Sequence, residues 1–124
     1  MDEPVYRMLG LCMKAGRLLS GNEQVAEGLK NVKAPKGALL IITEDSSPRT
    51  KDEYRNAAER AHISYRLFGE KERLGSALGK GVRTAALITD KGFSRAIAEK
   101  IDKALAERKL PGGSRKWALV PLVA

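Results

Sequence analysis

The sequence is poor in the residues that build catalytic and metal centres. Its 124 residues include one cysteine and one histidine. A single cysteine cannot form an internal disulfide, which is typical of a reducing cytoplasm, and this pair does not supply the usual ligands of zinc. No apolar run approaches the roughly 20 residues that span a bilayer, and the acidic, interrupted start predicts no signal peptide. We therefore expect a cytoplasmic chain without metal, cofactor or membrane.

The few candidates for enzyme chemistry each favour a simpler interpretation. Cys12 lies on the apolar stripe of an expected helix, so we expect a buried, inert thiol rather than a nucleophile. His62 lies at an expected helix end and is predicted to face solvent. Glu44 and Asp45 follow a strand and could bind Mg²⁺, but successive side chains in a strand point to opposite faces.

A glycine-rich segment, residues 75–81, resembles a phosphate-binding loop only superficially. Three residues instead of four separate Gly75 from Gly79, and Gly81 follows Lys80 where the nucleotide-binding motif requires Ser or Thr. No acid, base and nucleophile come together anywhere in the sequence, so we expect no catalytic residues and no enzyme.

Positive charge is the most prominent feature that the sequence does have. Lysine and arginine number 23 against 15 acids, which gives a formal net charge of +8. A small basic chain attracts polyanions, because its positive field favours the approach of phosphates. The composition therefore favours a nucleic-acid partner over a merely solvated positive surface.

The apolar pattern alternates between helical and extended periods. Helical spacing starts at Val5, at a Ser20-x-x-Glu23 capping box, at Ser47-Pro48, at Glu70 and at Asp90. Between them, residues 17–19, 38–43, 63–67 and 84–89 are typical of short strands, and two of these runs are apolar throughout. Such alternation predicts an α/β fold, a three-layer α/β/α sandwich with a small central mixed sheet.

The chain is expected to form one domain over residues 1–110 with a C-terminal tail over 111–124. Pro111-Gly112-Gly113 separates the two, and the tail turns from basic to apolar around Trp117. We favour docking of this apolar end on the domain, with stacking of Trp117 on a base as the alternative.

Basic residues gather beside two expected helix starts. Lys14 and Arg17 are expected to flank the helix opened by Ser20, whereas Lys71, Arg73, Lys80 and Arg83 bracket the helix expected over residues 70–78. Helix N-termini present free N–H groups, and glycines around Lys80 let a backbone approach closely. These positions favour phosphate contacts over simple solvation.

Several motifs in order resemble the L7Ae/L30e family of ribosomal proteins, and the versions found here look most like its small bacterial members. The similarity covers roughly residues 4–106. The resembling segments are residues 9–16 with Lys14-Ala15-Gly16, then 18–21, 41–48, 71–80 with Leu78-Gly79-Lys80, and 86–93 with Thr89-Asp90-Lys91-Gly92-Phe93. This family has an α/β/α fold and binds kink-turn RNA, so the resemblance implies RNA contacts from the second helix N-terminus and from the loop before the last strand.

In the family a Gly-x-Asn-Glu-x-x-Lys signature recognises sheared G·A pairs, and this sequence matches it only in part. Gly21 fits. If Val25 and Leu29 set the register, the Asn, Glu and Lys positions hold Glu23, Gln24 and Glu27. If Asn22-Glu23 is the Asn-Glu pair, the Lys position holds Ala26. The lysine is absent in both registers.

We interpret the chain as a non-enzymatic protein that binds structured, kink-turn-like or ribosomal RNA. Its partners would be RNA and the ribosome, and we expect a monomer. The alternative is an adaptor of the translation apparatus with a degenerate RNA surface, which the missing lysine favours. The predicted RNA-binding residues are Lys14, Arg17, Gly21, Asn22, Glu23, Gln24, Lys71, Lys80, Val82, Arg83 and Thr84.

Overall fold

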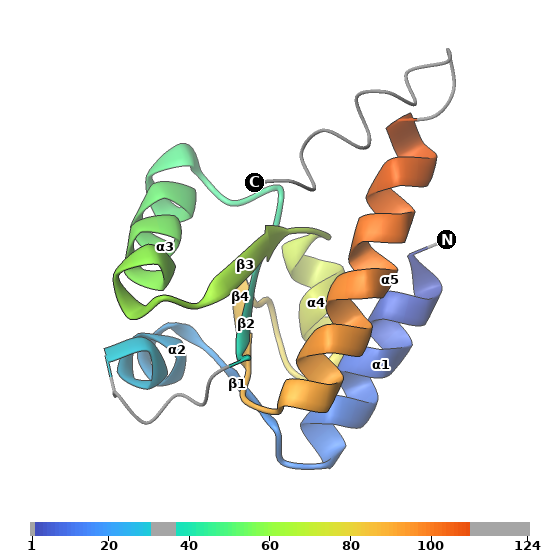
Figure 1. Cartoon of the computed structure of the whole chain (residues 1–124), viewed down its shortest axis with the longest axis horizontal. Helices are drawn as coiled ribbons and strands as arrows, with labels where there is room; N and C mark the ends of the chain where they lie inside the picture. Colours follow the sequence, from blue (N-terminus) through green and yellow to red (C-terminus); the bar gives the residue numbers. More distant parts are fainter. Residues whose placement is uncertain (1, 31–36, 110–124) are drawn as a thin grey trace.

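A four-stranded sheet lies between two layers of helices in the computed structural model, which describes residues 2–30 and 37–109 (Figure 1). The elements are α1 (Glu3–Lys14), β1 (Leu18–Ser20), α2 (Asn22–Lys30), β2 (Leu39–Ile42), α3 (Pro48–Ala61), β3 (Ser64–Leu67), α4 (Lys71–Ala77), β4 (Ala85–Ile88) and α5 (Lys91–Lys109). The strand order in the sheet is β1-β4-β2-β3. Strand β4 is antiparallel to both of its neighbours, β1 and β2, whereas β2 and β3 are parallel. The predicted three-layer sandwich with a mixed sheet is confirmed.

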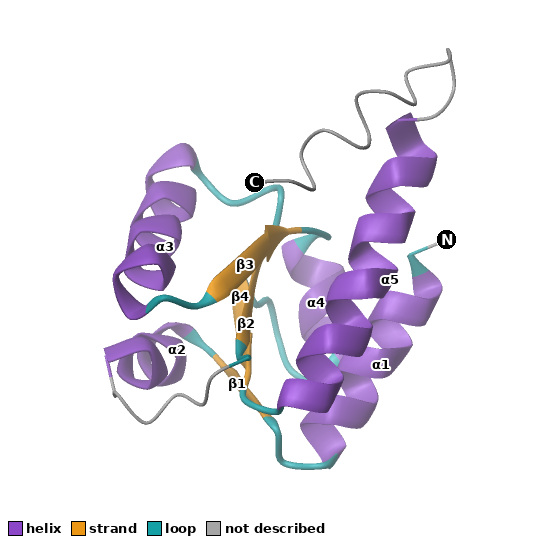
Figure 2. Cartoon of the chain, viewed as in Figure 1, coloured by secondary structure: helices purple, strands orange, loops and turns teal. Residues whose placement is uncertain are grey.

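The two central strands divide the core into two halves. Every residue of β2 and β4 is buried. Leu39 and Ile41 face one layer, whereas Leu40 and Ile42 face the other, because side chains alternate along a strand. Helices α1, α4 and α5 cover the first face, and α2 and α3 cover the second (Figure 2).

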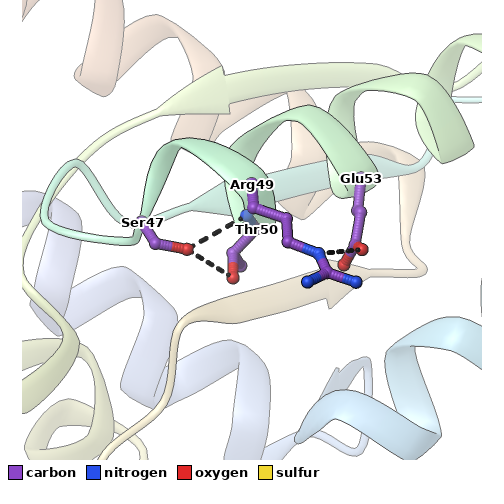
Figure 3. A network of polar contacts seen from close by, with 4 residues as sticks. All are labelled: Ser47, Arg49, Thr50 and Glu53. Atoms are coloured by element: carbon purple, nitrogen blue, oxygen red, sulfur yellow. Dashed lines mark hydrogen bonds and ion pairs between the residues drawn. The ribbon is translucent and has the colours of Figure 1, made fainter.

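Two helix starts form as the sequence predicts. The Ser47 hydroxyl accepts the Thr50 N–H at 3.2 Å, with Pro48 in the first turn, and Arg49 and Glu53 form an exposed ion pair one turn apart (Figure 3). At α5 the Asp90 carboxylate accepts the Phe93 N–H at 2.8 Å. Each cap satisfies a backbone donor that the helix itself leaves free.

A half-buried ion pair joins the edge strand β3 to α5. Arg66 Nε lies 2.7 Å from Asp102 Oδ1, and the second guanidinium nitrogen lies 3.1 Å from Oδ2. This bidentate geometry fixes the orientation of both side chains, which is stronger than a single exposed contact. The pair therefore positions the middle of α5 over the β3 side of the sheet.

The predicted placements of Cys12 and His62 are confirmed. Cys12 is completely buried, and its thiol donates to the Arg17 carbonyl at 3.3 Å. His62 is exposed in the left-handed conformation after α3. No helix within residues 2–30 and 37–109 has the length and apolar character needed to cross a bilayer. The predicted tail, residues 111–124 with Trp117, lies outside the described residues.

The buried thiol leads to a prediction on reactivity. Burial, together with the nearby Asp90 carboxylate and partly offset by Arg17, raises the pKa of Cys12 from 9.0 to about 11. Two pKa units mean roughly 100-fold less thiolate at pH 8, and the thiolate is the reactive form. We expect an aromatic disulfide reagent to label the native protein at least about 100-fold more slowly than the urea-unfolded protein. Equal labelling rates would show that Cys12 is accessible.

Candidate nucleic-acid interface

The predicted site residues are organised by one edge of the sheet. Strands β1, β2 and β3 end at this edge and β4 begins there, as the register pairs Ile42 with both Ala85 and Leu67. The Thr43 N–H continues the ladder by donating to the Thr84 carbonyl at 2.9 Å. We call this boundary, with the segments 20–22, 43–47, 68–71 and 79–84, the loop edge.

The segment 79–84 is fixed by backbone contacts to α4. The Arg83 N–H donates to the Lys71 carbonyl at 3.1 Å, and the Lys80 N–H donates to the Gly75 carbonyl at 2.8 Å. A Cβ at Gly75 would overlap the Gly81 carbonyl, so only glycine lets the segment lie this close to the helix. The return of the chain over α4 therefore determines where Lys80, Val82 and Arg83 are presented.

Arg83 connects this segment to the start of α2. Its Nε donates to the buried Ser20 hydroxyl at 3.4 Å, a long contact, and another guanidinium nitrogen donates to the Val82 carbonyl at 3.0 Å. The Val82 side chain is 53% exposed. The structure thus brings Gly21 and Arg83 together from sequence positions more than 60 residues apart, as the resemblance implied.

The predicted capping box at Ser20 is wrong. Ser20 is the last residue of β1 and pairs with Ala86, while the Gly21 carbonyl accepts the first helical hydrogen bond, from the Val25 N–H at 3.0 Å. The residue with that role is the N-cap, so the cap is Gly21. Pairing in the sheet took precedence over the local capping pattern.

Tyr54, which none of the sequence motifs singles out, orients Asn22. The Tyr54 hydroxyl of α3 donates to the Asn22 amide oxygen at 2.6 Å. Burial raises the pKa of Tyr54, and a hydrogen bond with Thr84 partly opposes this, so the phenol remains a donor at neutral pH. With its oxygen engaged, the Asn22 amide NH₂ is left to donate to a ligand.

The first turns of α2 present two different sides. Asn22 and Ala26 line a groove toward α3. Gly28, one turn after Gln24, packs against the sheet, where a Cβ would lie 2.8 Å from a methyl carbon of Leu87 in β4 and 3.0 Å from one of Leu19 in β1. Glu23, Gln24 and Glu27 are all exposed. By helical periodicity Gln24 lies on the β1 side with Gly28, the side where Arg83 contacts Ser20.

Lys71 lies at the loop edge, but its neighbour Asp45 does not form a metal site. Both carboxylate oxygens of Asp45 accept from the Lys71 N–H, at 3.1 and 3.3 Å, which caps α4. Across residues 2–30 and 37–109, no three His, Cys, Asp or Glu side chains gather as ligands. Asp45 therefore has a structural role at the start of α4.

Lys14 and Arg17 do not flank the start of α2, contrary to the prediction. Arg17 precedes β1, and its carbonyl accepts the Thr89 N–H at 2.9 Å, at the edge of the sheet opposite Ser20 and Gly21. The error arose because β1 separates Arg17 from α2 by the full length of a strand, whereas sequence proximity suggested adjacency. Both side chains are exposed.

Comparison with known proteins agrees with this arrangement. The model of the ribosomal protein L7Ae/L30e/S12e/Gadd45 family matches residues 3–99. The chain belongs to this family. The resemblance identified in the sequence is thereby confirmed, and so is the prediction of a non-enzymatic protein, because the family is one of ribosomal proteins and the matched sequences below are an RNA-binding protein and a ribosomal protein.

Individual relatives cover most of the chain. The RNA-binding protein YlxQ of Bacillus subtilis is 27% identical over 97 residues, 78% of this chain and 94% of its own length. The large ribosomal subunit protein eL30 of Triticum aestivum is 35% identical over 98 residues, 77% of this chain and 85% of its own. A protein of unknown function from Bacillus halodurans has a TM-score of 0.71 at 33% identity, covering 79% and 96% of the two chains.

A more distant structure shows the same fold. The Giardia lamblia 15.5kD RNA binding protein has a TM-score of 0.64 at 22% identity and covers 82% of this chain and 88% of its own. The fold of this L7Ae/L30e family member is therefore shared across long sequence distances.

The close contact at Gly75 leads to a prediction on the loop edge. We expect Gly75→Ala to displace residues 79–84, costing roughly 1–3 kcal/mol of unfolding free energy, as other overpacked sites do. In hydrogen exchange, the Lys80 and Arg83 amides should lose protection. Ser76→Ala, at an exposed neighbouring position, is the control and should leave both amides protected. Unchanged protection in Gly75→Ala would contradict the packing described here.

Proposed function

We propose that this chain binds structured RNA through the loop edge, as a monomer in the cytoplasm. The observation that carries the proposal is the Arg83–Ser20 contact, because it joins a basic segment to the end of β1, directly before α2. Within residues 2–30 and 37–109, no carboxylate forms an ion pair with Lys71, Lys80 or Arg83. These cations are available to phosphates. Family membership and the RNA-binding YlxQ support the same function.

The chemistry suits an RNA whose bases are exposed at an irregular site. Guanine presents N7 and O6 acceptors to the amides of Asn22 and Gln24, and Glu23 can accept from an exocyclic amine. The exposed Val82 offers an apolar surface to a base. A regular A-form helix hides these base edges in a narrow major groove, so recognition requires a kink, bulge or loop. We therefore propose kink-turn-like or ribosomal RNA as the target.

The geometry of α2 favours one of the two signature registers. Gln24 lies on the same side of α2 as Gly28, toward the sheet, whereas Asn22 and Ala26 line the groove toward α3. The register that uses Glu23, Gln24 and Glu27 therefore places Gln24, and not Asn22, on the side where Arg83 contacts Ser20. In this register Gly21 and Thr84 shape the backbone around the RNA, and Glu27 replaces the lysine of the signature.

A second candidate function rests on the acids of α2. Glu23 and Glu27 are exposed one turn apart on the face that would meet RNA. Two carboxylates there repel phosphates, which favours an adaptor that contacts a protein of the translation apparatus instead. The net charge and the unpaired cations of the segment 79–84 favour RNA, so RNA binding remains our main proposal.

Salt dependence distinguishes the two functions. If about 3–5 phosphates are contacted, a plot of log K against log[salt] should have a slope of about −2 to −4, because counterions are released from the RNA. Nitrocellulose retention of labelled cellular RNA at several salt concentrations measures this slope. A flat dependence would favour the adaptor.

Charge reversal at Glu27 tests the register. We expect Glu27→Lys to strengthen binding to a standard kink-turn RNA by roughly 1–2 kcal/mol, because it removes repulsion and adds a charged donor. Glu59→Lys is a matched control, since Glu59 is also exposed but lies near the end of α3. An equal gain in both variants would indicate a general charge effect, and no gain in a folded Glu27→Lys would refute the register.

A further inference from the structure

The outer face of α1 is basic and lacks acidic neighbours in the sequence. No acid occurs between Glu3 and Glu23, while Arg7 and Lys14 lie within α1. Both side chains are exposed, and no ion pair links either to a carboxylate of the described chain. Leu11, between them on the helix, is 54% exposed. Leu11 and Val82 are the two exposed large apolar side chains of the described residues, and each has basic neighbours.

This face adjoins the segment that presents Lys80. Helix α1 touches α4 at Gly10, where a Cβ would lie 3.0 Å from the Ala77 carbonyl oxygen. Gly10 is three residues from Arg7 and four from Lys14, so both cations lie beside this contact on the helix surface. Ala77 ends α4, and Lys80 follows three residues later. The basic surface of α1 and the start of the segment 79–84 therefore both lie beside the C-terminal end of α4.

At the N-terminal ends of α1 and α4, the positive charge of Arg73 is neutralised by Glu3. Arg73 pairs with Glu3 at 3.0 Å and lies over the Tyr6 ring, 4.4 Å from its centroid. Arg73 is thus engaged within the protein. The positive charge without an ion-pair partner among the described residues therefore lies toward Arg7 and Lys14, and we call these two residues the α1 stripe.

We propose that the α1 stripe binds the phosphate backbone of an RNA arm that leaves the loop edge. This proposal rests on the proposed function and extends it to a second contact on the same molecule. Arg7 and Lys14 are seven residues apart, about 10 Å along the helix, so they reach different phosphates. Contacts between these cations and phosphates carry no base information, so the interaction depends on the length of the arm and not on its sequence. The exposed Leu11 packs against sugar rings between the two cations.

Two RNAs with the same internal loop test the contact. One carries flanking stems too short to extend past the loop edge, and the other carries stems of about one helical turn. We expect the wild-type protein to bind the long RNA about tenfold more tightly at moderate salt. The double variant Arg7→Ala/Lys14→Ala should lose this advantage, with a salt slope smaller by about 1–2 for the long RNA, and should bind the short RNA as the wild type does.

A matched double variant controls for net charge. Lys30→Ala/Arg60→Ala also removes one lysine and one arginine from exposed positions, at the ends of α2 and α3 on the opposite face of the sheet. It should retain the preference for the long RNA. Melting temperatures of both variants, compared with the wild type, establish that each is folded.

Three results would overturn the proposal. Equal wild-type affinity for the two RNAs would show that no arm is contacted, and equal losses in both double variants would show a general charge effect. A loss in Arg7→Ala/Lys14→Ala that is the same for short and long RNA would place the stripe in the primary site instead. If wild type bound neither RNA in a salt-dependent way, the proposed function would fail and this proposal with it.

Discussion

Burial of β2 and β4 on both faces is the constraint on which the rest of the structure depends. All eight residues of these strands are buried, so each face must be covered by helices. With both faces occupied, polar groups for binding are left to the ends of the strands, where the backbone can also reach solvent. The loop edge follows from this arrangement: three strands end there, β4 begins there, and the connecting segments are fixed by backbone hydrogen bonds to α4 and to the ladder.

The loop edge is positioned by main chain more than by side chains. Gly75 allows residues 79–84 to lie directly on α4, and two amide–carbonyl bonds fix the segment there. Side chains then add orientation: Arg83 reaches Ser20, and Tyr54 orients Asn22. Groups held in place before a ligand arrives lose little entropy when they bind it, which favours affinity at a small interface.

Local signals made much of the fold predictable. Ser47 with Pro48, and Asp90, specify their helix starts within a few residues, and alternating burial of the apolar strands gives the layers. The prediction of a capping box at Ser20 was wrong because this residue fits both a capping pattern and the end of a strand, and in the structure it pairs with Ala86 in the sheet. Tyr54 and Asn22 are 32 residues apart in the sequence, so no local pattern predicts the hydrogen bond between them. The prediction for Arg17 was wrong because closeness in sequence suggested closeness in space, whereas the length of β1 separates Arg17 from the start of α2.

Acidic and basic side chains lie on different elements of the proposed RNA-binding surface, and we assign them different roles in binding. In the proposed RNA complex, Glu23 and Glu27 of α2 oppose the approach of phosphates, so this helix would contribute little general attraction and would act through hydrogen bonds that require a correctly placed base. The proposed attraction comes from Lys80 and Arg83, and from the α1 stripe where an arm extends that far. Phosphate contacts supply affinity for many RNAs, whereas an acidic helix penalises any RNA that brings a phosphate where a base amine is required. In this L7Ae/L30e family member, the absence of the signature lysine is therefore compatible with the proposed RNA binding, in which the flanking cations supply affinity and α2 supplies discrimination.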